Sequence, residues 1–78
     1  MDKEDWIAEG KRLGAKYTVN MMDIFDYDHY PKFANSDEEM SKLRSENGQN
    51  MQRIYEVWLT ETGEQVPLSM FPLFEDRL

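Results

Sequence analysis

Two segments rich in β-branched and aromatic residues, 16–25 and 50–60, constrain the fold most strongly. In each segment apolar side chains recur at alternate positions, which is the pattern of a β-strand. The first segment has one mainly apolar face, as expected of a strand with one side on a core. The second has two half-apolar faces, because Ile54 and Trp58 lie opposite its other apolar residues, which favours a central strand or one covered by a partner. The apolar faces carry Tyr17, Val19, Met21 and Phe25 in the first segment, and Met51, Tyr55, Val57 and Leu59 in the second. Asp23 and Arg53 interrupt these two faces. Since a lone strand cannot satisfy its backbone, the two segments predict a sheet.

Helix signals surround these strands. Residues 3–13 have apolar positions at helical spacing, Asp2 as a candidate N-cap and Gly14 as the residue that ends the helix. The run Ser36-Asp37-Glu38-Glu39 is a capping box, which predicts a second helix as far as about Glu46. Both helices are expected to lie against the sheet.

A short return strand is expected at residues 30–33, and Pro31 makes it an edge strand because proline has no backbone N–H to donate. We therefore predict an α+β fold, a single domain over residues 1–78 with the order α-β-β-α-β and a largely antiparallel three-stranded sheet. The apolar segment 64–78 is interrupted by Pro67 and Pro72, so it is not a regular helix. It either packs on its own sheet or docks on a second protomer.

Composition excludes several kinds of site. The chain of 78 residues has no cysteine and one histidine, so disulfides, cysteine-ligated metals and multi-histidine centres are excluded within one chain. A net charge of −7 opposes direct binding to nucleic acid or to an anionic membrane. No apolar segment is long enough to span a membrane, and no signal peptide is visible, so a cytoplasmic location is expected. Because so short a chain has a thin core, a homo-oligomer is also expected.

The chain carries no catalytic or cofactor motif. The only histidine, His29, has no serine or cysteine nucleophile near it in sequence, and the four glycines are isolated rather than grouped in a phosphate-binding loop. The acids around His29 lack the spacing of a calcium-binding loop. We therefore expect neither an enzyme, nor a cofactor, nor a bound metal.

The densest group of interaction-competent side chains lies in residues 23–33. Tyr27 and Tyr30 are candidate rings for stacking on a base or a partner side chain. The cations expected to meet an anion are Arg53 with Lys32 or Arg44, while Asp26, Asp28 and His29 are candidates for contact with a basic partner. Two alternatives remain open: Phe25 and Phe33 are core partners across the strands, and Asp23 with Arg53 is a purely structural ion pair.

The order of several motifs resembles a group of small uncharacterised proteins encoded by bacteriophages and bacteria. The resemblance covers residues 5–60 and rests on Gly14-Ala15 before an apolar strand, on Asp-x-Phe-Asp-Tyr-Asp-x-Tyr-Pro, and on Asn-Met-Gln-Arg-Ile-x-Glu-Val at residues 50–57. Beyond Leu59 the chain departs from the group. The resemblance implies a phage setting, in which small acidic proteins act against host defences.

Three binding functions follow as hypotheses. The leading one is a homo-oligomer that sequesters a small anionic, nucleotide-like signal, with Tyr27 and Tyr30 stacked on a ring and Arg53, with Lys32 or Arg44, on the phosphate. The alternative is an acidic inhibitor that docks on a host defence protein, such as a CRISPR effector, through its acidic surface and residues 25–33. The third is an accessory protein of the virion or of its assembly.

Overall fold

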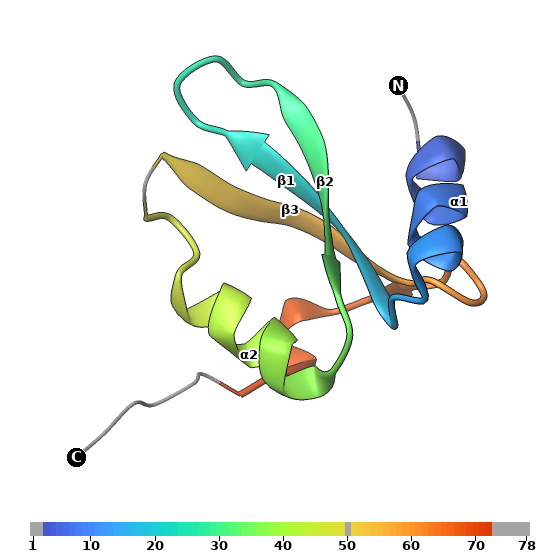
Figure 1. The fold of residues 1–78 in the computed structure, drawn as a ribbon. Helices are drawn as coiled ribbons and strands as arrows, with labels where there is room; N and C mark the ends of the chain where they lie inside the picture. The colour runs from blue at the N-terminus through green and yellow to red at the C-terminus, as the bar shows by residue number, and fades with distance from the viewer. Residues whose placement is uncertain (1–2, 50, 73–78) are drawn as a thin grey trace.

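The computed structural model describes residues 3–49 and 51–72 as a small compact α+β domain. Figure 1 shows its elements in chain order. They are α1 (Lys3–Leu13), β1 (Tyr17–Asp23), β2 (His29–Ala34), α2 (Asp37–Ser45), β3 (Gln52–Leu59), β4 (Gln65–Val66) and the short 3-10 helix η1 (Leu68–Met70). The predicted order is confirmed, with one further short strand. The candidate N-cap Asp2 lies outside the described residues.

All strand pairs are antiparallel, and the sheet has the order β2-β1-β3-β4. The strand that contains Pro31 lies at an edge, as predicted. The fourth strand was not expected, because it is only two residues long and stands directly before Pro67. It is defined by its pairing with β3, in which Val66 pairs with Val57 and Gln65 with Trp58.

A β-bulge in β3 corrects the predicted alternation of that strand. Asn20 pairs with Glu56, but the next residue of β1, Met21, pairs with Ile54, so Tyr55 is an extra residue in β3. An inserted residue places the side chains before it on the face opposite to the one that simple alternation predicts. Consequently Ile54 packs against the core, and Arg53 pairs with Met22 on the other side of the sheet rather than interrupting the apolar face.

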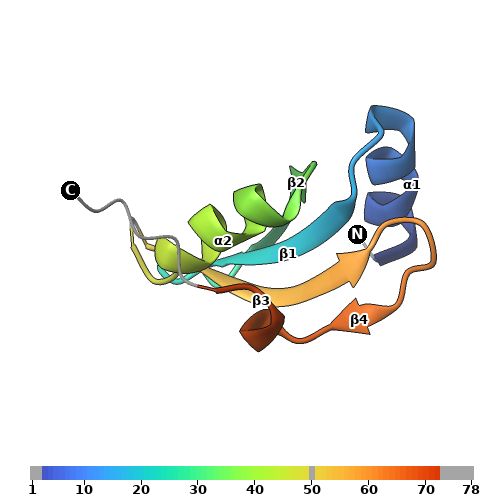
Figure 2. The same cartoon turned by 90° about the horizontal axis from the view of Figure 1, so that it is seen from below.

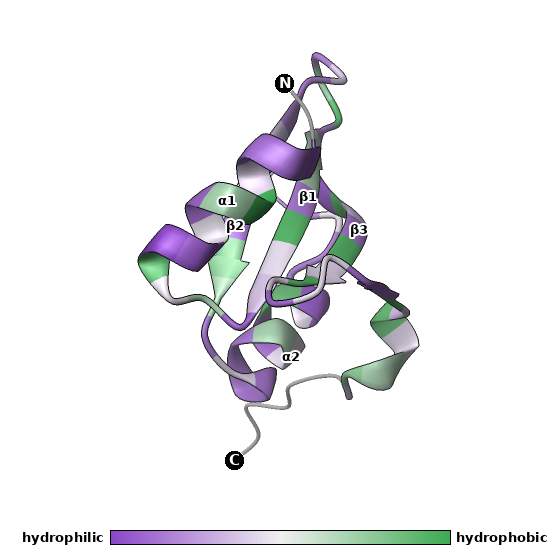
Figure 3. Ribbon diagram, turned by 90° about the vertical axis from the view of Figure 1, so that its right-hand side faces the viewer, coloured by the Kyte–Doolittle hydropathy of each residue, from purple (hydrophilic) through white to green (hydrophobic). Residues whose placement is uncertain are grey.

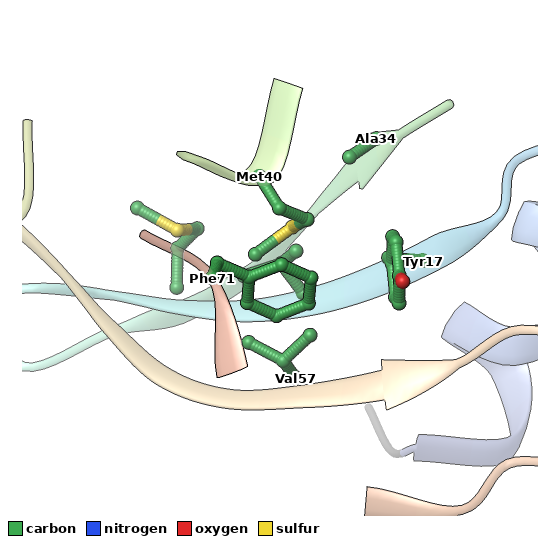
Figure 4. Packing of buried hydrophobic residues seen from close by; sticks show 7 residues of the cluster. Tyr17, Ala34, Met40, Val57 and Phe71 are labelled. Atoms are coloured by element: carbon green, nitrogen blue, oxygen red, sulfur yellow. The ribbon is translucent and has the colours of Figure 1, made fainter. Parts of the chain in front are cut away.

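The sheet has a core face and an open face. On the core face, Met40 of α2 and Phe71 pack over β1 and β3 (Figure 4). The buried cluster consists of Tyr17, Val19, Met21, Ala34, Met40, Val57 and Phe71. The rings of Tyr17 and Phe71 meet edge to face with 5.0 Å between centroids, so residues 65–71 pack on the sheet of their own chain. Residues 73–78, the end of the predicted docking or swapped segment 64–78, lie outside the described residues.

Helix α1 covers one end of the open face, beside the start of β1 (Figures 1 and 2). It approaches closely because Gly10 has no side chain; a Cβ there would lie 2.4 Å from Thr18 Oγ1. The hydroxyls of Thr18 and Thr60 share a hydrogen bond of 2.8 Å beneath the helix. In the ribbon of Figure 3, α1 alternates between hydrophilic and hydrophobic segments, whereas β1 and β3 carry hydrophobic stretches. Within residues 3–49 and 51–72, no helix covers the rest of the open face.

Candidate functional site

The end of the β1–β2 hairpin exposes large apolar side chains beside acids. Phe25 is 72% exposed and Tyr27 70%, and Met51, which immediately precedes β3, is 51% exposed. Asp26 and Asp28 are exposed between and beside the two rings. We call residues 24–28 together with Met51 the hairpin end (upper end of the sheet in Figure 1). The hypothesis that Phe25 is a core partner of Phe33 is therefore wrong, because Phe25 lies past the last residue of β1.

Backbone hydrogen bonds fix the shape of the hairpin end. Asp23 Oδ1 accepts from the N–H of Phe25 at 2.9 Å, and its carbonyl accepts from the N–H of Tyr27 at 2.6 Å. The N–H of Ile24 donates to the carbonyl of Met51 at 2.8 Å, which ties the loop to the start of β3. Asp23 is thus the capping residue of a turn. No ion pair joins it to Arg53 in the described part of the chain, so the structural-pair alternative is wrong.

The hairpin end also holds two residues in an unfavourable backbone conformation. Tyr27 and Met51 both have φ of +62°, and they are the two non-glycine residues with positive φ among those described. The left-handed region costs an ordinary residue about 1–2 kcal/mol. Such conformations gather at functional sites, where the surrounding structure enforces them. Here each one carries an exposed, large apolar side chain.

Three other predicted site residues lie on or beside the core face, away from Tyr27. Tyr30 packs against the core and donates its hydroxyl to Gln52 Oε1 at 2.7 Å. Burial, together with the nearby Asp23 carboxylate, raises the pKa of Tyr30 above its ordinary value. Lys32 lines a small cavity of about 120 Å³ near the end of α2, and Arg44 donates a hydrogen bond to the carbonyl of Phe71. These side chains do not converge with Tyr27 on one pocket within a single chain.

The remaining two predicted residues, Arg53 and His29, lie on the open face. Both are exposed. Met22 of β1 pairs with Arg53 of β3 on one side and with His29 of β2 on the other. The His29 ring meets the ring of Tyr55 edge to face, with 4.9 Å between centroids. The bulge at Tyr55 places this ring there, which no simple alternation could predict.

An open pocket of about 380 Å³ adjoins His29 on this face. We call it the open-face pocket; α1 and all four strands contribute to its lining, which consists of Lys3, Trp6, Asn20, His29, Glu56, Trp58 and Gln65. His29 Nδ1 lies 2.8 Å from Asn20 Oδ1, and Asn20 Nδ2 donates to Glu56 Oε1 at 3.4 Å. Sequence reasoning missed this pocket. The alternation of β1 placed Asn20 on the correct face, but nothing indicated that α1 would stop short of it.

Other kinds of site find no support in the structure. Within residues 3–49 and 51–72, no cluster of three or more His, Cys, Asp or Glu side chains could hold a metal ion. Nor does any helix in that part of the chain have both the length and the apolar character needed to cross a membrane.

Comparison with protein-family models, curated proteins and solved structures found no match to this chain.

Proposed function

We propose that this chain is a non-enzymatic binding protein that docks on a basic surface of a protein partner through the hairpin end. The observation that supports this most directly is that two residues with a strained backbone also have exposed side chains. Tyr27 and Met51 keep a costly conformation and direct large side chains outward instead of burying them. Since burial does not repay this cost within the chain, a contact with a partner is the physical explanation that we propose.

The chemistry of the hairpin end suits a protein partner. Exposed rings bury large area with few torsions to fix, so aromatic residues often anchor interfaces. Asp26 and Asp28 flank Tyr27, and the whole chain carries a net charge of −7, which would steer it toward a basic partner. The counter-defence setting implied by the phage resemblance is part of this proposal. A host defence protein is then the kind of partner expected.

Sequestration of a nucleotide-like signal ranks second. Its proposed rings and cations are divided among the hairpin end, the core face and the open face, so a pocket built from them needs a second protomer. Of the two alternatives for the apolar segment 64–78, packing on its own sheet is the one that holds as far as Phe71, so these residues offer no contact to a second protomer. The third alternative, a virion accessory role, gains nothing specific from these contacts.

The test is a comparison of proteins retained from a bacterial lysate. Wild type, the double variant Phe25→Ser/Tyr27→Gly, and a control double variant Leu13→Ser/Met70→Ser are immobilised separately. The control removes two apolar side chains that are each 51% exposed but lie outside the hairpin end. The proposal predicts a protein that is retained by wild type and control, is absent with the hairpin variant, and is released at high salt.

The contradicting result is equally specific. If the hairpin variant retains the same proteins as wild type, the hairpin end is not the docking surface. Native mass spectrometry of the purified chain then decides about the second candidate. A defined oligomer with extra mass that disappears on denaturation would favour sequestration of a small ligand.

A further inference from the structure

We propose that the open-face pocket binds the guanidinium group of an arginine side chain. This deepens the proposed function, because the arginine would belong to the basic partner that the hairpin end contacts. His29 links the two surfaces, since it is the first residue of β2 after the hairpin loop and also lines the pocket. A volume of about 380 Å³ lies within the range of pockets that hold small ligands.

A carboxylate that is hydrogen-bonded to a buried amide is the first element of the site. Glu56 lines the pocket, and one of its oxygens accepts from Asn20 Nδ2 at 3.4 Å. Asn20 is itself only 8% exposed, so its amide is a buried partner for this carboxylate. The second carboxylate oxygen has no hydrogen-bond partner within the described residues. A guanidinium group pairs with a carboxylate through planar, charge-assisted hydrogen bonds.

Asn20 connects the carboxylate to His29. Its amide nitrogen donates to Glu56, and its Oδ1, which can only accept, lies 2.8 Å from Nδ1 of His29. The pocket therefore places the Glu56 carboxylate in one hydrogen-bonded row with the Asn20 amide and the His29 ring.

The rings of Trp6 and Trp58 form other walls of the pocket, and a cation of the chain itself already lies over Trp58. The ammonium group of Lys3 lies 5.2 Å from the centroid of the Trp58 ring. The rings of Trp6 and Trp58 are 6.3 Å apart. Tyr55, which is 59% exposed, lies outside the lining but packs edge to face on the lining residue His29. A planar guanidinium group gains from stacking on such rings more than a compact ammonium does. This favours arginine over lysine.

Lys3 makes the sign of the ligand testable. An anionic ligand would use its ammonium group as a partner, whereas a cationic ligand is repelled by it and competes with it for Trp58. Removing the charge at Lys3 therefore has opposite effects in the two cases. The net charge of −7 and the Glu56 carboxylate favour the cation.

The experiment is a titration followed by NMR, with N-acetyl-arginine-N-methylamide as the probe and the indole N–H signals of the two tryptophans as reporters. We expect saturable shifts of the Trp58 signal in the wild-type chain. Glu56→Gln keeps an oxygen for Asn20 but removes the charge, and it should weaken probe binding at least fivefold. Glu38→Gln, on α2 over the other face, makes the same charge change and should leave binding within twofold. Lys3→Met should strengthen binding.

Three results would overturn the proposal: no saturable shift with the arginine probe, an equal effect of Glu56→Gln and Glu38→Gln, or weaker binding by Lys3→Met. A saturable response to adenosine monophosphate in place of the arginine probe would assign the pocket to an anion. The titration is independent of docking by the hairpin end. The variant Phe25→Ser/Tyr27→Gly should bind the probe like wild type, so a failed lysate experiment and a failed titration remain distinguishable.

Discussion

The substitution Gly10→Ala tests how α1 is seated on the open face. Gly10 is buried in the middle of α1, where alanine would ordinarily be the better helix former. A Cβ at this position would lie 2.4 Å from Thr18 Oγ1, 3.1 Å from Thr60 Cγ2 and 3.3 Å from Phe33 Cδ1. The first distance is a severe overlap. Thr18 is fully buried and hydrogen-bonded to Thr60, so its hydroxyl has nowhere to move without loss.

Two opposing effects set the magnitude. Replacing glycine by alanine inside a helix gains about 1 kcal/mol in helix propensity. Overpacking a well-packed site costs about 1–3 kcal/mol, and a buried hydroxyl that loses its partner costs about 1–3 kcal/mol more. We therefore expect Gly10→Ala to lower the free energy of unfolding by about 1–5 kcal/mol. The loss is a substantial part of the stability of so small a domain.

The assay is urea unfolding followed by tryptophan fluorescence, since Trp6 and Trp58 meet at the same helix–sheet contact. Thr18→Ala removes the overlapping oxygen, so in that background Gly10→Ala should cost at least about 1 kcal/mol less than in wild type. If Gly10→Ala instead stabilises the chain by the full helix propensity, α1 does not pack on Thr18. The wall of the open-face pocket would then be wrongly placed.

Three further outcomes follow from other contacts. Tyr27→Gly should leave the free energy of unfolding unchanged or raise it by up to about 1 kcal/mol, because glycine adopts positive φ without strain. If urea unfolding shows a loss of more than about 1 kcal/mol, the backbone of Tyr27 is not strained. The Tyr17 hydroxyl and the Lys16 ammonium hold the pKa of Asp37 below its ordinary 3.8. The charged carboxylate therefore stabilises the folded chain above that pH, and this stabilisation is lost as the pH falls through the lowered pKa. Asp37→Asn should therefore flatten the acid limb of a stability profile, and an unchanged slope would refute the pairing. Phe71→Ala should cost about 3–5 kcal/mol in urea unfolding, and a loss below about 1 kcal/mol would mean that the C-terminal segment does not complete the core.

Local signals in the sequence were sufficient for the helices and the edge strand. Gly14, with φ of +74°, ends α1 as its position predicted. Ser36 caps α2 by accepting from the N–H of Glu39, as the capping box predicted, although the Glu39 carboxylate reaches Asn35 instead. Pro31 marked the edge strand correctly. Each of these features depends on a few neighbouring residues, so the sequence contains the whole cause.

Features that depend on distant pairing were not predictable. The inserted Tyr55 is defined only by the register between β1 and β3, and it moved Arg53 and Ile54 to faces opposite to those expected. Likewise, β4 forms only because Val66 pairs with Val57 of β3, which is distant in sequence. The density of rings and acids in residues 23–33 did point to the surface that we propose for docking. The open-face pocket was missed because its lining comes from five separate elements.

Site-specific photo-cross-linking shows whether the hairpin end contacts a protein partner. A photoreactive phenylalanine derivative is placed at position 27 in one sample and at Leu13, an exposed position on α1, in another. Both are irradiated in bacterial lysate. We predict a covalent adduct of one defined mass from position 27 and none from position 13. Adducts from position 13 alone, or no adduct from position 27, would contradict the account.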